Sequence, residues 1–131
     1  MRILDTDVIV EVLRGNARVR EAQGLSEGII ATTVISVAEL CYGAAKATHS
    51  DREYAAIDEF LLSVVVLDVS VEAARVFGET KAALERAGRR LPDADLLIAA
   101  ICLARRATLV TGNGRHFARI SSLATEDWIR A

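Results

Sequence analysis

Aromatic residues, cysteines and long apolar runs are all scarce in this chain of 131 residues. Aromatic side chains make up only 5% of it, so no platform on which nucleic-acid bases could stack stands out. The longest apolar run, Leu96–Ala104, has nine residues, whereas a helix needs about 20 to span a membrane. No secretory signal is visible, because Met1–Leu4 leads straight into Asp5. We therefore expect a cytoplasmic protein.

Cysteine and histidine are each present only twice, and neither type forms a cluster. Cys41 and Cys102 lie 61 positions apart in apolar segments without metal-binding spacing, which predicts buried free thiols in a reducing compartment. His49 and His116 are isolated from each other. Since His116 has no second histidine beside it, we interpret it as a solvent-facing or substrate-side residue rather than a metal ligand.

The overall composition is that of a soluble globular protein, with 52% hydrophobic and 26% charged residues. The length suits a single domain over residues 1–131, and neither a linker nor an internal repeat interrupts it. The formal net charge of −2 hides an asymmetry, because residues 86–119 contain seven arginines against two aspartates. This basic segment favours a polyanionic partner.

Short β-branched or apolar runs alternate with segments of helical periodicity. This alternation predicts an α/β fold with a parallel sheet of four or five strands covered by helices on both faces. The expected strands cover residues 2–5, 28–32, 64–68, 108–111 and 122–124. The expected helices run from residue 8 to Gly15, 16–22, 36–44, 50–62, 70–87 and 93–104.

The apolar run Leu96–Ala104 predicts a helix that begins near Asp93 and is enclosed by the rest of the protein. Asp95 then lies at the edge of the core, where a carboxylate is costly without a partner. Asp5 follows the first strand directly, and Glu39 lies one helical turn beyond the second. Because ligands of parallel sheets gather at the carboxyl ends of the strands, we expect these three acids to converge.

Three converging carboxylates are unstable without a cation. Two charges 4 Å apart repel by about 4 kcal/mol at an effective dielectric of 20, so three pairs cost roughly 12 kcal/mol. Mg²⁺ or Mn²⁺ would remove this repulsion, since both prefer oxygen ligands and keep several waters. The three acids therefore predict metal-assisted hydrolysis of a phosphodiester.

Several of these acids also have simpler interpretations. Glu39 fits a capping box opened by Ser36, in which each side chain bonds the other's backbone. Asp93 is a natural N-cap and cannot face the same way as Asp95. Asp7 is suited to capping the first helix. These interpretations treat the acids as structural.

Four segments of the chain resemble PIN-domain proteins, and most closely the VapC toxins of bacterial toxin–antitoxin pairs. The segments are Leu4–Asp7, Ile35–Gly43, Leu91–Ala100 and Ala107–Thr111 with its continuation to His116-Phe117. They occur in the family's order and spacing over nearly the whole chain. The resemblance implies a PIN-like three-layer αβα sandwich.

The resemblance also implies an activity, a cofactor and partners. It implies a Mg²⁺- or Mn²⁺-dependent endoribonuclease that is inhibited by a VapB-type antitoxin and is usually dimeric. Asp5 and Asp95 match the family's principal metal-binding acids, and Glu39 matches the third. Asn113 stands near the place of a fourth acid in many relatives. We further predict supporting roles for Asn113, Asp93 and Thr111 and contacts to RNA by Arg89, Arg90 and Arg115.

Three alternatives remain open at this point. A phosphatase of the haloacid-dehalogenase type would use Asp5 as nucleophile, but neither Lys46 nor Lys81 adjoins the late acids in the sequence. A receiver-like signalling module would use Asp68 as phosphoacceptor and requires a lysine after a late strand. A nucleic-acid binder would use the acids only as helix caps.

Overall fold

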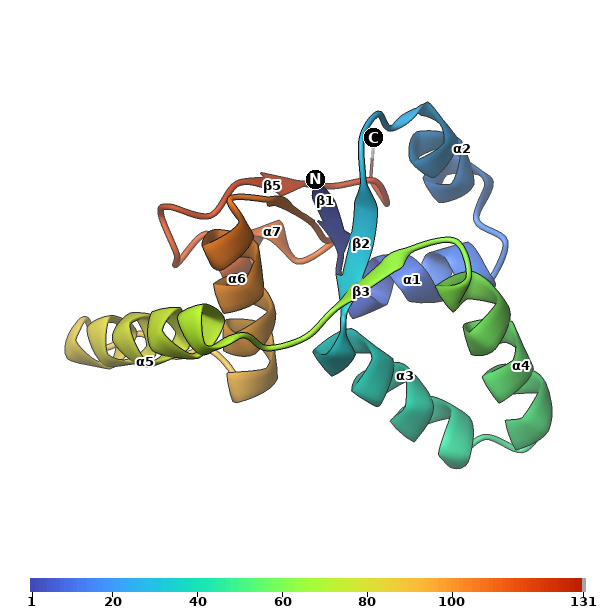
Figure 1. Ribbon diagram of the computed structural model, residues 1–131, viewed down its shortest axis with the longest axis horizontal. Helices are drawn as coiled ribbons and strands as arrows, with labels where there is room; N and C mark the ends of the chain where they lie inside the picture. Colours follow the sequence, from blue (N-terminus) through green and yellow to red (C-terminus); the bar gives the residue numbers. More distant parts are fainter. Residues whose placement is uncertain (131) are drawn as a thin grey trace.

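The computed structural model describes residues 1–130 and contains a five-stranded parallel sheet with the strand order β3-β2-β1-β4-β5 (Figure 1). The strands are β1 (Arg2–Leu4), β2 (Ile30–Thr33), β3 (Val65–Leu67), β4 (Thr108–Val110) and β5 (Thr125–Glu126). The helices are α1 (Thr6–Leu13), α2 (Ala17–Leu25), α3 (Val34–Ala45), α4 (Ser50–Leu61), α5 (Val71–Arg86), α6 (Asp93–Arg105) and α7 (Gly114–Phe117). The predicted α/β class and parallel sheet are confirmed.

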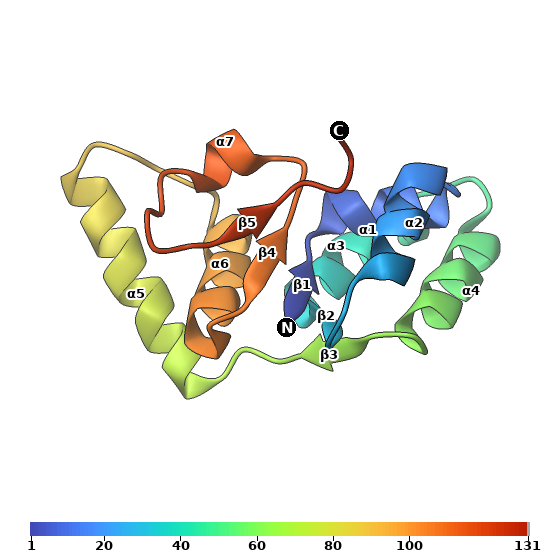
Figure 2. The ribbon, with the colours of Figure 1, turned by 90° about the horizontal axis from the view of Figure 1, so that it is seen from above.

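The sheet separates two hydrophobic cores, as expected for a three-layer αβα sandwich. Ile3 and Leu109 point into a core shared with α5, α6 and α7, while their neighbours Leu4 and Val110 point into a core shared with α1 to α4. This alternation is the two-residue period of a strand, which places successive side chains on opposite faces. Figure 2 shows the two groups of helices on either side of the sheet.

The apolar run of α6 is enclosed as its composition predicts. Its residues Leu96, Ile98–Cys102 are at most 2% exposed. At the far end Arg106 adopts a left-handed backbone with φ 53° and closes the helix. Cys102 is buried and Cys41 half-buried, and both are free thiols.

Most predicted helix ends are correct because the caps are local. Asn16 and Ser70 accept hydrogen bonds from backbone N–H groups of the first turns of α2 and α5. Gly15 and Gly88 follow helices with φ values of 81° and 70°, which favour glycine. The helix α2, however, continues through Gly24 to Leu25 instead of ending before it.

Three other predicted boundaries are wrong. Thr33 caps α3 by accepting from the N–H of Ser36, so Ser36 is inside the helix and does not open a capping box. Pro92 is the N-cap of α6, so Asp93 is its first residue and not its cap. The last strand lies at residues 125–126, not 122–124.

Asp7 does not cap α1 either, because Asp5 holds that position. The Oδ2 atom of Asp7 instead accepts from the N–H of Gly112, 2.9 Å away, in the loop after β4. This bond ties α1 to the loop that leads into α7. Since a Cβ atom at Gly112 would lie 2.7 Å from Asp7 Oδ2 and 2.8 Å from Ile129 Cδ1, the tie depends on glycine.

Within residues 1–130, none of the helices combines the length and the apolar character needed to cross a membrane.

We therefore expect Gly112→Ala to lower the free energy of unfolding by about 1–3 kcal/mol, because the new methyl group overpacks this contact. Gly114→Ala is the matched control, since a Cβ atom there meets nothing within 4 Å. Its effect should stay within about 0.5 kcal/mol. Urea denaturation of both variants measures the difference, and equal stabilities would contradict the close contact.

Candidate active site

Asp5 lies at the carboxyl end of β1, the central strand, and is only 5% exposed. Its Oδ1 atom accepts from the N–H of Thr6 at 2.8 Å, and its Oδ2 atom accepts from the hydroxyl of Thr111 at 2.8 Å. Burial, with smaller contributions from the negative charges of Asp7 and Asp95, outweighs these two hydrogen bonds and raises the pKa of Asp5 to about 6. A carboxylate in this state is stabilised by any cation that reaches it.

Asp95 lies in the first turn of α6 and is the second acid of the site. Its negative charge is the smallest of the causes that raise the pKa of Asp5, so the two carboxylates lie within electrostatic range of each other. The Oδ2 atom of Asp95 is 2.7 Å from Nε2 of His116 in α7. Both side chains are partly exposed, at 25% for Asp95 and 31% for His116.

Glu39 reaches the site through a threonine. Its Oε1 atom accepts from the hydroxyl of Thr6 at 2.7 Å, and the Ser36 hydroxyl lies 2.9 Å from the same oxygen of Thr6. Since Thr6 also donates its N–H to Asp5, a chain of hydrogen bonds joins Glu39 to Asp5. Glu39 therefore points to the sheet edge, and the capping-box interpretation of this residue is wrong.

The predicted supporting residues behave differently from one another. Thr111 is fully buried, donates to Asp5 and accepts from the N–H of Asn113 at 3.0 Å. The side chain of Asn113 is exposed and makes no cap to α7. Asp93 accepts from Lys81 of α5 at 3.0 Å, on the exposed surface. Lys81 and Asp93 are thus adjacent in space, although they are far apart in the sequence.

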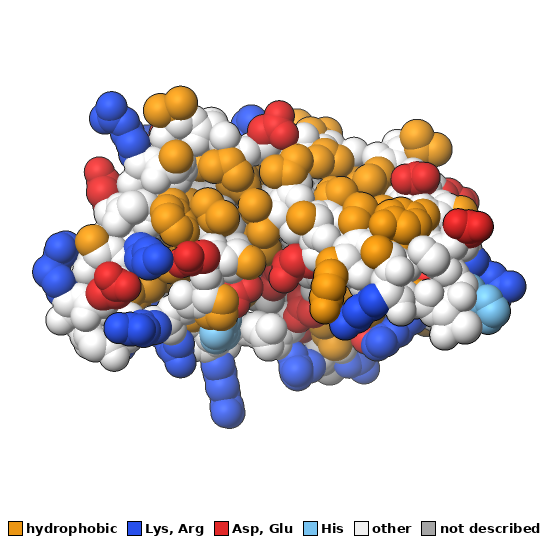
Figure 3. Space-filling model, turned by 90° about the horizontal axis from the view of Figure 1, so that it is seen from below, with side chains coloured by type: hydrophobic (Ala, Val, Ile, Leu, Met, Phe, Trp, Pro, Cys, Tyr) orange, Lys and Arg blue, Asp and Glu red, His pale blue; other side chains and the backbone are white. Residues whose placement is uncertain are grey.

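The acids lie on one face of the molecule. Figure 3 looks onto the side where β1 and β2 end and shows acidic side chains near its middle, with Lys and Arg side chains around them. Within residues 1–130, no group of three or more His, Cys, Asp or Glu side chains is spaced to hold a metal ion by itself. The charges of Asp5 and Asp95 interact, and Glu39 is linked to Asp5 through Thr6.

The donor set nevertheless fits a hard divalent cation. All its ligand atoms are carboxylate oxygens, and Mg²⁺ is usually bound by one or two carboxylates while it keeps several waters. One oxygen nearby also lacks a partner, since Oδ1 of Asp7 is buried without a hydrogen bond. Burial raises the pKa of Asp7 as it does that of Asp5. Asp5 and Asp95 are therefore the residues that could hold an ion.

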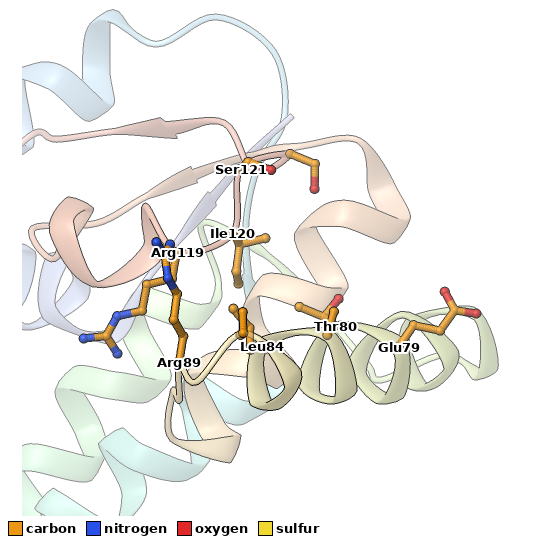
Figure 4. Close-up of a pocket in the computed structure, with 10 residues that line it drawn as sticks. Glu79, Thr80, Leu84, Arg89, Arg119, Ile120 and Ser121 are labelled. Carbon is orange, nitrogen blue, oxygen red and sulfur yellow. The ribbon is translucent and has the colours of Figure 1, made fainter.

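A cavity of about 620 Å³ opens beside His116 and is mainly basic. Arg115, Arg119 and Arg130 line it, with Asp127 as its acid. A second hollow, of about 500 Å³, lies between α5 and residues 119–122 and is lined by Arg89 and Arg119 (Figure 4). It is apart from the acids, but Arg119 borders both hollows.

Sequence reasoning did not foresee the contacts of Thr6 and His116. Because Thr6 follows Asp5 directly, the sequence predicts that it lies beside the site. Its hydrogen bond to Glu39, however, joins residues 33 positions apart in the sequence. His116 is separated from Asp95 by 21 positions and by β4. Both contacts depend on which strands are neighbours, and that order has no local signal.

The geometry also bears on the phosphatase alternative and on the receiver-like alternative. In a receiver-like fold the first and third strands are adjacent, whereas here β2 separates β1 from β3 and Asp68 follows the edge strand. A phosphatase with Asp5 as nucleophile would also need a lysine close to the acids at the strand ends, yet no Lys or Arg contributes to the pKa of Asp5. Lys81 pairs with Asp93 and not with Asp5.

In a chelator-containing buffer, Asp5→Asn should raise the free energy of unfolding at pH 7.5 by up to about 3 kcal/mol. The pKa of Asp5 is higher in the folded state, at about 6, than the ordinary 3.8. Folding therefore binds a proton between these values, and the wild type loses stability as the pH rises from about 4 to about 6. The Asn variant should lack this loss.

Denaturation at several pH values measures the effect, with the exposed Asp58→Asn as the control that should follow the wild type. If Asp5→Asn is less stable than the wild type at pH 7.5, the ionised carboxylate is not the source of the penalty.

Comparison with known proteins agrees with this architecture. The family model that describes the PIN domain matches residues 2–123. The tRNA(fMet)-specific endonuclease VapC of Shigella flexneri is 35% identical over 127 residues, covering 96% of each chain. Ribonuclease VapC2 of Haemophilus influenzae is 34% identical over 128 residues, covering 97% of each.

Solved structures give the same result. VapBC2 from Rickettsia felis, bound to a DNA fragment from its promoter, matches with a TM-score of 0.92 and 32% identity over 97% of this chain and 98% of that chain. DNA-bound VapBC from Salmonella typhimurium matches with a TM-score of 0.92 and 31% identity over 97% of each chain. The chain belongs to the PIN-domain family and, within it, to the VapC proteins.

Proposed function

We propose that this chain is the toxin of a type II toxin–antitoxin pair, an endoribonuclease that cleaves RNA phosphodiester bonds with the help of a divalent ion. The observation that carries the proposal is the pair of acids with interacting charges, Asp5 and Asp95, at the carboxyl edge of a VapC-type sheet. Relatives at about a third identity over the whole chain are named ribonucleases or endonucleases. The whole chain, residues 1–131, acts as one PIN domain.

In this proposal Asp5, Asp95 and Glu39 form the metal-binding and catalytic set. Asp5 and Asp95 would hold Mg²⁺ or Mn²⁺, with Glu39 as the third acid of the set. When bound, such an ion supplies an activated water and neutralises charge on the phosphate. Thr111 fixes one oxygen of Asp5, and Thr6 holds Glu39 against Asp5. Asp93 has a structural role, because Lys81 occupies its carboxylate.

The RNA lies across the basic side chains around the acids. Arg115 lines the cavity beside His116, and Arg89 lines the hollow on the other side of Arg119. The guanidinium of Arg119 donates a hydrogen bond to the backbone carbonyl of Arg90, so the segments around residues 90 and 119 are joined. These positive charges bind phosphates, whereas the exposed amide of Asn113 orients water or a carboxylate near the acids.

The partners follow from the family. One matching structure, VapBC-5 from Mycobacterium tuberculosis, belongs to the VapBC family of toxin–antitoxin systems. We propose a VapB-type antitoxin as the inhibitor, a homodimer of this chain within a larger toxin–antitoxin assembly, and a location in the cytoplasm.

The test of the proposed function is RNA hydrolysis by the purified chain. We expect cleavage that EDTA stops and that added Mg²⁺ or Mn²⁺ restores. Asp95→Ala should reduce the rate at least 10³-fold and should restore growth to cells that express the chain without its antitoxin. Asp58→Ala is the matched control and should stay fully active. Chelator-resistant cleavage, or an active Asp95→Ala variant, would overturn the proposal.

The basic residues predict that RNA affinity falls as salt rises, because phosphate contacts release counterions. With EDTA present to keep the RNA intact, Arg89→Gln and Arg115→Gln should each weaken binding and reduce the slope of log K against log salt by about 0.7. Arg52→Gln on α4 is the charge-matched control and should change neither. Binding that is independent of salt in the wild type would remove these arginines from the RNA contact.

A further inference from the structure

His116 is the polar group beside the acids to which the proposed function gives no role. It belongs to α7, the short helix that follows β4. Its Nε2 atom lies 2.7 Å from Oδ2 of Asp95, the shortest contact made by either acid of the pair Asp5 and Asp95. A contact of this length constrains the orientation of the Asp95 carboxylate.

The short helix α7 and the buried Phe117 restrict where His116 lies. The neighbouring Phe117 is 1% exposed and packs in the same core as α6, the helix of Asp95. The backbone N–H groups of His116 and Phe117 both donate to the carbonyl of Asn113, at 3.0 and 3.2 Å. The rings of His116 and Phe117 meet edge to face, with centroids 5.7 Å apart. The backbone of His116 is thus anchored through its helix and its ring is packed against Phe117.

The hydrogen bond fixes which atoms remain free. An ionised carboxylate only accepts, so Nε2 of His116 carries the hydrogen and donates it. Oδ2 of Asp95 is then engaged, and no hydrogen bond involves Oδ1 among the contacts of residues 1–130. Both oxygens of Asp5 already accept hydrogen bonds from Thr6 and Thr111. Oδ1 of Asp95 is therefore the one oxygen of this pair without a hydrogen-bond partner within residues 1–130.

We propose that His116 is a positioning residue, which by its Nε2–H bond to Oδ2 turns the Oδ1 atom of Asp95 toward the divalent ion. This inference rests on the proposed function. The imidazole does not contact the ion and does not take part in the reaction. A partner that orients a ligand typically contributes 10- to 100-fold to metal affinity.

The test compares three substitutions of His116 by their affinity for Mn²⁺, measured by calorimetry on the full chain without RNA. Gln places an amide N–H near the position of Nε2, whereas Asn is too short and Ala has no donor. We expect His116→Gln to bind Mn²⁺ within about threefold of the wild type. His116→Asn and His116→Ala should bind it about 10- to 100-fold more weakly. The control is His49→Ala, because His49 is the other histidine of the chain and is exposed. Its affinity for Mn²⁺ should match that of the wild type.

The same titration of Asp95→Asn separates the two proposals. If Asp95→Asn binds Mn²⁺ like the wild type, Asp95 is not a ligand and the proposed function fails. If Asp95→Asn loses binding while His116→Asn and His116→Ala keep it or bind more tightly, the metal site stands and the role of His116 is overturned. Equal losses for His116→Gln and His116→Asn, with unchanged melting temperatures, would also overturn it, since the donor would then not matter.

Discussion

The burial of one carboxylate, that of Asp5, is the constraint on which the site depends. Only 5% of Asp5 is exposed, and its pKa rises to about 6 as a consequence. Two hydrogen bonds, from Thr6 and Thr111, reduce this penalty without removing it. Because those donors come from α1 and from the end of β4, the same bonds also align the elements that form the site. A cation near Asp5 would relieve this unfavourable burial of charge.

The parallel sheet explains why the acids share one edge. Asp5 ends the central strand β1, and α3 starts directly where β2 ends, so Glu39 lies within two turns of the same edge. The helix α6 returns antiparallel to the strands to reach β4, and its N-terminus with Asp95 therefore lies at that edge too. The active-site geometry is thus a result of the right-handed β–α–β connections and not of any local motif.

Competition between local and long-range hydrogen bonds accounts for the predictions that were wrong. Ser36 and Glu39 have the spacing of a capping box, but Thr33 satisfies the helix end and leaves both side chains for Thr6. Asp7 could cap a helix but bonds Gly112 instead. Sequence cannot distinguish these outcomes, because the donors and acceptors are chemically the same in either case.

The sequence by itself determined most of the elements, α7 (Gly114–Phe117) excepted, and the layered α/β class, and it pointed to the candidate acids. Periodicity, helix caps and apolar runs are local signals, so they can be recognised without knowing which elements pack together. Only the tertiary structure decided the order of the strands, and with it which acids are neighbours. The pairing of His116 with Asp95, and the link from Glu39 to Asp5, join segments that no local signal connects. Such contacts follow from packing two cores against one sheet, which is a property of the whole chain.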